Sequence, residues 1–256
     1  MHNAYRARIA ESLNSGVPAR RGKKLERASP KRSDTSVRVL AAAIEMFAER
    51  GFESTTMRDL ASAVGIKAPG LYNHYRSKED ILAAALIWVI QDFNAHVLGP
   101  DDPKQAPIAR LKGILERHLL YQIDNPTINK AFDVLVRSGV LVRMQRQEAQ
   151  NEILRLTRVY IKVVSDLTQT IVEPLGEDAP PLKPAVNCIT TMYDHVHRWY
   201  HRDGPITVSE LVDIYWSFSA KILGIDNRQP RSKPRTRTNA ARSSARATVV
   251  DRATNS

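Results

Sequence analysis

Residues 37–82 constrain the fold more than any other part of the chain, because their pattern requires several helices in close succession. Apolar side chains at helical spacing form one stripe along a first helix: Val37, Leu40, Ala41, Ile44, Phe47 and Ala48. A polar residue among 33–36 can cap the start of this helix. Gly51 can end it, since glycine adopts the left-handed backbone conformation freely, and Phe52 would then pack against Phe47.

Two short helices are predicted next. Thr56 and Asp59 form a capping box that begins the first of them, and Gly65 ends it. Pro69 lies in the opening turn of the next helix, where its missing N–H group is not needed, and that helix ends near Tyr75. Ser77 then caps a long helix that runs to about residue 98. Two short helices joined by a tight turn and braced by a longer one form a helix-turn-helix unit.

The second short helix is the predicted recognition helix. Leu71 and Tyr75 lie one turn apart and anchor it, so that its opposite face can enter the major groove of DNA. Gly70 permits close approach, and Asn73 can pair in bidentate fashion with adenine. The predicted DNA-binding residues are Thr56, Lys67, Ala68, Pro69, Gly70, Tyr72, Asn73, His74 and Lys78.

Backbone phosphates are the expected partners of four of these residues. Tyr72 and His74 can bond phosphates directly, and Thr56 and Lys78 begin helices whose N-terminal dipoles attract anions. Three alternatives stay open: Tyr72 can be mainly a packing residue, His74 a surface histidine without a DNA contact, and Lys67 merely solvated.

The stretch from Val39 to Leu82 resembles the DNA-binding domain of the tetracycline-repressor (TetR) family, through the pieces AAIEMFAERGFESTTMRDLA and VGIKAPGLYNHYRSKEDIL. The resemblance implies a homodimer that reads a palindromic operator, usually as a repressor that a small molecule releases. It also implies phosphate contacts at Thr56, Tyr72, His74 and Lys78, and an approach to bases at Ala68, Pro69, Gly70 and Asn73. Relatives often carry a larger aromatic or basic residue at the Asn73 position, so direct base readout is expected to be sparse.

Positive charge is concentrated at the two ends of the chain. The net charge is +11, of which residues 1–36 contribute +6 and residues 226–256 another +6. Residues 37–82 are neutral, and non-specific DNA affinity scales with the phosphates that a protein neutralises. We therefore expect the arm around residues 20–32 to add DNA contacts; the C-terminal tail can do the same or can simply be a solubilising end.

The sequence predicts an all-α fold, because helical periodicity continues to residue 222 and no run alternates as a strand would. We divide the chain into a disordered basic arm (1–33), a three-helix helix-turn-helix DNA-binding domain (34–80), a helical ligand-binding and dimerisation domain (81–226) and a disordered basic tail (227–256). Helices are expected at residues 78–98, 107–123, 128–136, 141–171, 185–199 and 207–222.

The last two helices are the predicted dimer face, since two such apolar and aromatic pairs can form a four-helix bundle across a two-fold axis. The resemblance assigns dimerisation to the same helices. The stretch WYHRDGPITVSEL from Trp199 is also similar to a branch of the family that controls fatty-acyl-CoA or steroid breakdown.

A small-molecule effector is expected among the helices after residue 78, in a site with apolar walls and few polar groups. The candidate residues are Phe93, His96, Leu120, Tyr121, Phe132, Arg143, Tyr160 and Met192. Arg143 could meet an anionic group, and ordinary core or surface positions are the alternative for each candidate. Asp194, His197 and His201 would share a helix face, but no further ligand cluster supports a metal site, and none is predicted.

Several classes of protein are not indicated. A single cysteine, Cys188, gives neither a disulfide framework within one chain nor a cysteine-based zinc site. The longest apolar run, Ile81 to Ile90, is too short to span a bilayer, and no secretory signal begins the chain. No P-loop, nucleophile elbow or dinucleotide fingerprint indicates an enzyme or a cofactor.

We therefore expect a cytoplasmic, ligand-responsive, homodimeric transcription regulator that binds double-stranded DNA. The alternatives are a sequence-tolerant DNA-organising protein without a ligand and, third, an enzyme built on the helical domain. The ratio of operator affinity to random-DNA affinity distinguishes the first two.

Overall fold

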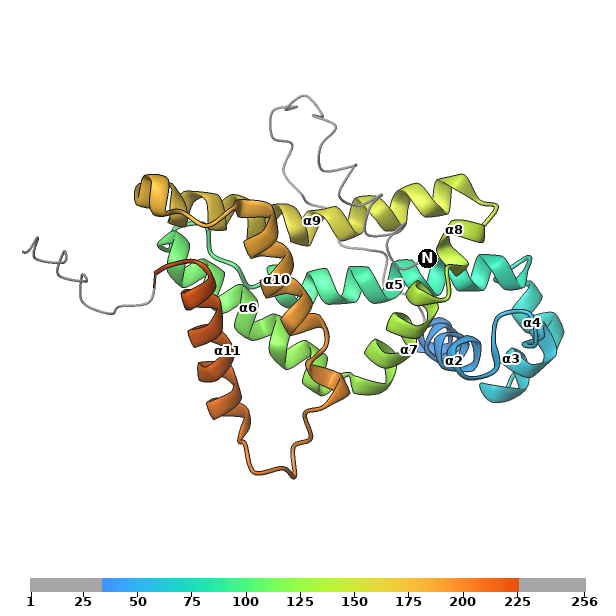
Figure 1. The fold of residues 1–256 in the computed structure, drawn as a ribbon. Coiled ribbons are helices and arrows are strands. Elements are labelled where there is room, and N and C mark those ends of the chain that lie inside the picture. The colour runs from blue at the N-terminus through green and yellow to red at the C-terminus, as the bar shows by residue number, and fades with distance from the viewer. Residues whose placement is uncertain (1–33, 226–256) are drawn as a thin grey trace, which may run out of the picture. The chain divides into compact units, whose positions relative to one another are not determined.

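The computed structural model describes residues 34–225, and every regular element in that range is helical, as predicted. The elements are α2 (Asp34–Arg50), α3 (Met57–Ala63), α4 (Ala68–Tyr72), α5 (Lys78–Leu98), α6 (Pro107–Asp124), α7 (Pro126–Arg137), α8 (Val140–Arg143), α9 (Gln147–Val172), η1 (Glu173–Asp178), α10 (Leu182–Asp194), η2 (Val196–Arg198) and α11 (Val208–Ile222), as labelled in Figure 1. The predicted basic arm and tail lie outside the described residues.

Local signals set the ends of the first helices as predicted. Gly51 ends α2 with a φ of 86°, and the rings of Phe47 and Phe52 pack with their centroids 5.2 Å apart. Thr56 and Asp59 form the capping box of α3. The Ser77 hydroxyl accepts a hydrogen bond from the main-chain N–H of Asp80 at 3.1 Å and caps α5.

A first hydrophobic core joins the helix-turn-helix to later helices. α2 packs against α3, α5 and α7, and side chains of α8 and the start of α9 complete the cluster. The predicted stripe of α2 is buried or half-buried, but Val39, Ala43 and Met46 are buried as well. α2 is therefore covered on more than one face, as expected for a helix with neighbours on several sides.

A second hydrophobic core lies among α6, the later part of α9, α10 and α11, with the end of α5. Its fully inaccessible side chains include Leu111, Ile114, Ile189 and Leu211. α11 begins at the predicted capping box of Thr207 and Glu210.

Two helices run through both cores. α5 and α9 lie side by side (Figure 1), with α2, α3 and α4 near one end of α5 and α6 near its other end. By length and composition, α5 is the one described helix that could cross a membrane. Its apolar side chains pack against α2, α6 and α9, and this packing accounts for its composition.

The predicted continuous helix over residues 141–171 is wrong, because α8 and α9 are separate. Met144 has an extended backbone conformation, with φ −59° and ψ 126°. The Gln150 side chain donates hydrogen bonds to the carbonyl oxygens of Leu141 and Met144, at 2.8 and 2.7 Å, and so satisfies acceptors that the break leaves open.

The predicted helix over residues 185–199 is also wrong at its end. α10 stops at Asp194, and a short 3₁₀ helix, η2, follows. The His195 ring bonds the carbonyl oxygen of Thr191 at 2.8 Å, which is the acceptor that the main-chain N–H of His195 would use in a continuing helix. Asp194, His197 and His201 therefore do not share one helix face.

Candidate nucleic-acid interface and effector region

α4 is anchored to the first core by the two side chains that periodicity selected. Leu71 is fully inaccessible, and the hydroxyl of the half-buried Tyr75 lies 3.0 Å from the hydroxyl of Ser36 on α2. Regular helix ends at Tyr72, before the predicted end, but the main-chain N–H of Tyr75 still bonds the carbonyl oxygen of Leu71 at 3.0 Å. The anchor therefore determines which face of α4 points outward.

The outward face of α4 carries most of the predicted DNA-binding residues. Tyr72 is 53% exposed, and Lys67, Pro69, Asn73 and His74 are also exposed. Ala68 and Gly70 are half-buried, and no atom lies within 4 Å of the point where a Cβ of Gly70 would be. The structure thus brings these seven residues together on one accessible surface, which we call the α4 surface.

Thr56 lies exposed at the start of α3, where its side chain already has partners. Its hydroxyl donates to Asp59 Oδ2 at 2.6 Å and accepts from the main-chain N–H of Asp59 at 3.2 Å. Hydrogen bonds from the side chain and main chain of Thr56 lower the pKa of Asp59. The carboxylate therefore stays ionised and holds the N-terminus of α3 in place.

Lys78 braces the loop between α2 and α3. Its ammonium group donates to the carbonyl oxygens of Phe52, at 2.6 Å, and Glu53, at 3.2 Å, and lies 4.4 Å from the centroid of the Phe52 ring. The side chain is 23% exposed. An ammonium group has three donors, so one remains for a phosphate.

Three predicted effector residues meet in the second core. Phe93 on α5 lies edge-on to Tyr121 and to Tyr160, with ring centroids 5.3 and 5.1 Å apart. His96 joins the edge of this group, 5.6 Å from the Tyr121 ring. These residues come from three helices, and we call them, together with His118, the aromatic cluster.

His118 is at the centre of the aromatic cluster and was not among the sequence candidates. Its side chain is fully inaccessible; Nδ1 lies 2.7 Å from the Tyr160 hydroxyl and Nε2 3.1 Å from Asp194 Oδ1. A helical period through Leu111, Leu115 and His118 places His118 on the buried face of α6, and this signal could have identified it.

The other four effector candidates have different surroundings. Phe132 packs against the first core and Met192 against the second. Leu120 is half-buried on α6, and the exposed Arg143 donates to the carbonyl oxygen of Ser138 at 3.1 Å.

The tyrosines of this region are neutral hydrogen-bonding groups at physiological pH. Burial raises the pKa of Tyr193 to about 12 and holds the pKa of Tyr160 well above its ordinary value. Burial and the carboxylate of Asp92, which accepts a hydrogen bond from the Tyr121 hydroxyl at 2.9 Å, raise the pKa of Tyr121. The aromatic cluster therefore offers neutral hydroxyls, suited to polar but uncharged parts of a ligand.

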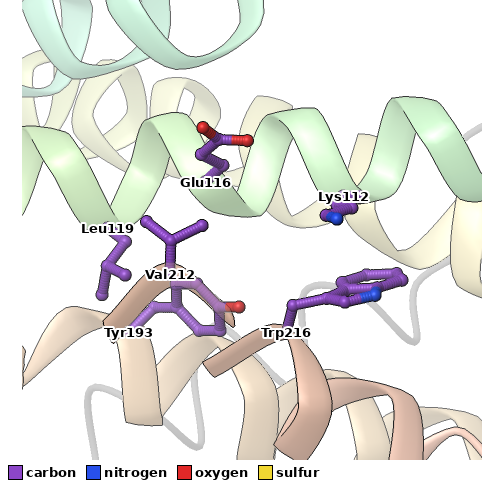
Figure 2. A pocket seen from close by; sticks show the side chains of 6 residues that line it. All are labelled: Lys112, Glu116, Leu119, Tyr193, Val212 and Trp216. Atoms are coloured by element: carbon purple, nitrogen blue, oxygen red, sulfur yellow. The ribbon is translucent and has the colours of Figure 1, made fainter. Parts of the chain in front are cut away.

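A narrow crevice lies next to the aromatic cluster, between α6, α10 and α11, and it has no room for a molecule of the size of water. Figure 2 shows that Tyr193, Val212 and Trp216 face Leu119, Glu116 and Lys112 of α6 across it. The Lys112 ammonium lies 5.8 Å from the Trp216 ring centroid. A drug-sized ligand needs about 300 Å³ or more, so an effector can bind here only if side chains move.

Two family models match the chain, one near its N-terminus and one over most of the helices that follow. Residues 39–85 match the family model of bacterial regulatory proteins of the tetR family, and residues 104–223 match that of the tetracyclin repressor-like C-terminal domain. The repressor KstR2 of Mycobacterium tuberculosis is 37% identical over 111 residues, which cover 42% of this chain and 44% of that protein. The uncharacterized regulator YezE of Bacillus subtilis is 40% identical over 68 residues, 27% of this chain and 34% of that protein. The chain thus matches less than half the length of these curated relatives.

Solved structures share the fold at lower sequence identity. A tetR-family regulatory protein of Rhodococcus RHA1 gives a TM-score of 0.63 at 23% identity, over 75% of this chain and 98% of that one. AibR in complex with isovaleryl coenzyme A and operator DNA gives 0.61 at 18% identity, over 74% and 98%. The ketosteroid transcriptional regulator KstR2 of Mycobacterium tuberculosis gives 0.61 at 22% identity, over 77% and 98%. These similarities show the fold of residues 34–225.

Proposed function

The chain belongs to the TetR family of bacterial regulatory proteins, and we propose that it is a homodimeric transcriptional repressor of the cytoplasm that a small molecule releases from a palindromic operator. The observation that carries this proposal is the α4 surface, where Tyr72, Asn73 and His74 are exposed on a helix that Leu71 anchors. Such a helix can enter the major groove without rearrangement of the core. We propose no catalytic activity.

The dimer interface that we propose lies on the last two helices, α10 and α11, with the segment that joins them. Ile214, Phe218 and Trp199 are 37%, 46% and 50% exposed, and Trp199 stacks on Tyr215 between them on α11. Large apolar side chains gathered on one face favour a partner surface. A second copy related by a two-fold axis would cover the same residues on both protomers.

Phe218→Asp tests the interface. We expect it to convert the dimer to monomers in sedimentation experiments, because it places a charge where an apolar contact forms. Val142→Asp is the matched control, since Val142 is 47% exposed on α8, away from this face. A Phe218→Asp protein that stays dimeric would place the interface elsewhere.

We propose that the effector binds at the aromatic cluster and is an acyl-CoA-like or other hydrophobic molecule. The relatives named above, one in complex with isovaleryl coenzyme A and one a ketosteroid regulator, support this class. An effector shifts the population of protein forms only by its differential affinity for them. Release therefore requires that the ligand prefers a form whose two α4 helices do not match successive major grooves.

The decisive experiment is a footprint on the DNA upstream of the gene, followed by competition with random duplex. A repressor should prefer its site by about 10³-fold or more, whereas a sequence-tolerant DNA-organising protein would show little preference. Asn73→Ala should weaken operator binding by about 1–3 kcal/mol, because one base contact is lost, and should relax the base preference at that position. The affinity for random DNA should not change.

Titration of the complex with isovaleryl coenzyme A and longer acyl-CoA thioesters tests the effector class. We expect a thioester to release the DNA, with free coenzyme A and free fatty acid as controls. If no thioester releases the DNA, the acyl-CoA assignment fails while the operator assignment stands.

A further inference from the structure

The turn between α8 and α9 docks on the start of α5, beside the recognition helix. Glu79 Oε1 accepts hydrogen bonds from the main-chain N–H groups of Gln145, at 2.7 Å, and Arg146, at 3.4 Å. The Arg146 guanidinium also forms an ion pair with Asp80. In Figure 1 this turn lies at the same end of α5 as α3 and α4. A segment far along the chain is therefore held next to the α4 surface.

A groove open to solvent lies at this junction, lined by His74, Arg76, Asp80 and Arg146. His74 belongs to the α4 surface, and Arg76 is exposed and forms no ion pair within residues 34–225. The Arg146 side chain remains 51% exposed although it pairs with Asp80. Two arginines and a histidine line the groove with the carboxylate of Asp80, and the carboxylate of Glu79 lies at the same junction, where it accepts the main-chain N–H groups of Gln145 and Arg146. The exposed guanidinium groups of Arg76 and Arg146 are therefore the groups that can meet an anion here.

We propose that this groove binds a backbone phosphate of the operator beyond the bases that α4 reaches, with Arg146 as its main ligand. The inference rests on the proposed function, since it assigns the phosphate to DNA bound by α4. Guanidinium groups bind phosphate oxygens in bidentate fashion, and this geometry favours arginine over lysine. Asp80 holds Arg146 beside the groove in the free protein, and a phosphate competes for the same guanidinium.

This contact has a consequence for regulation. Arg146 directly precedes α9, and α9 carries Tyr160 of the aromatic cluster. A phosphate bound by Arg146 makes DNA affinity depend on the position of α9. Movement of α9 in the second core would therefore act on DNA directly, in addition to any change in the spacing of the two α4 helices.

The test compares wild-type protein with Arg146→Gln, Arg146→Lys and Asp80→Asn on operator and random duplexes between 50 and 200 mM salt. A plot of log affinity against log salt has a negative slope, and each lost phosphate contact should make it less steep by about 0.9. The loss of affinity between the lowest and the highest salt concentration should then be roughly 3- to 4-fold smaller. We expect Arg146→Gln to show this change once per protomer, on both duplexes alike. Arg146→Lys should keep the slope, and Asp80→Asn should strengthen binding because it frees Arg146 and removes a negative charge.

Arg155→Gln is the matched control, because Arg155 lies in the first half of α9, is 59% exposed and, like Arg146, pairs with a carboxylate, that of Glu152. Its slope should equal that of wild type. An unchanged slope in Arg146→Gln overturns the proposal. Weaker binding by Asp80→Asn, equal to that of Arg146→Gln, also overturns it, because the ion pair would then act only as a structural tie.

Two further outcomes separate this inference from its premises. If Arg146→Gln changes only the effector concentration needed for release, the groove serves a phosphate of the ligand and the DNA assignment is wrong. If wild-type protein shows no operator preference, the repressor function fails, and a reduced slope of Arg146→Gln on random duplex still supports the phosphate groove.

Discussion

The two hydrophobic cores differ in the kind of side chain that fills them. The buried residues of the first core are aliphatic apart from Phe47 and the three methionines Met46, Met57 and Met144. The second core buries five tyrosines, Tyr121, Tyr160, Tyr193, Tyr200 and Tyr215, and encloses His118 and Gln122. The first is therefore held by non-directional packing, and the second also by hydrogen bonds with defined partners.

This difference suits the two tasks that we propose. A close-packed aliphatic core resists small displacements and keeps α4 in one orientation. A core with buried hydrogen bonds can exchange an internal partner for a ligand group, at a cost if any group is left unpaired. We therefore expect substitutions in the two cores to have different consequences for DNA binding and for release.

The largest expected effect comes from cavities in the two cores. Leu40→Ala and Leu211→Ala each remove a fully inaccessible side chain and should lower the free energy of unfolding by about 2–5 kcal/mol. Urea unfolding should show one transition by circular dichroism and by tryptophan fluorescence, because α5 and α9 run through both cores. Two separate transitions would show that the cores fold independently.

A smaller effect is expected from a buried hydroxyl. Tyr160→Phe leaves His118 Nδ1 without its partner at 2.7 Å and should cost about 1–3 kcal/mol of stability. Operator affinity without effector should not change, whereas the effector concentration needed for release should. Tyr72→Phe is the control for stability alone, since that exposed hydroxyl should alter stability by less than about 0.5 kcal/mol, whereas its predicted phosphate contact makes it unsuitable as a control for operator affinity.

The two capping boxes provide a matched pair. Thr56 and Thr207 make the same reciprocal hydrogen bonds, to Asp59 and Glu210, so each change to alanine should lower stability by about 1 kcal/mol. Only Thr56→Ala should also weaken operator binding, because Thr56 is a predicted phosphate contact and Thr207 is not. Equal operator affinities for the two variants would remove Thr56 from the predicted DNA-binding residues.

The smallest effect concerns acid. Burial lowers the pKa of His197 from its ordinary 6.5, although the nearby carboxylate of Asp133 opposes this. Below pH 6.5 the His197 imidazole takes up a proton more readily in the unfolded chain than in the folded protein. The contribution of the neutral imidazole to stability is therefore present above pH 6.5 and is lost as the pH falls through the folded pKa. The free energy of unfolding should differ less between pH 7.5 and pH 5.5 for His197→Gln than for wild type. His201→Gln, at an exposed position, serves as the control.

Much of the helix-turn-helix could be predicted from local pattern. The burial of Leu71 beside the exposed Tyr72 follows from helical period, and Gly51, Thr56 and Ser77 mark helix ends. The effector region was harder to predict. Three aromatic candidates meet there, but His118 was missed: the helical period of α6 indicates that it is buried, whereas its partners lie on other segments and cannot be identified from that period.

The starts of α3, α5 and α11 and the end of α2 could be predicted from the sequence, since a cap joins groups within four residues of one another. The ends of α4 and α10 were predicted too late in the chain. Three features required the assembled molecule: the break before α9, the buried contacts of His118 and the groove at Arg146. The turn before α9 and the groove are held by Glu79 and Asp80, and Asp80 lies 66 residues before its partner Arg146. The ring of His118 contacts Tyr160 and Asp194, which lie on other helices. Such contacts form only when distant helices pack, and no short stretch of sequence contains both partners.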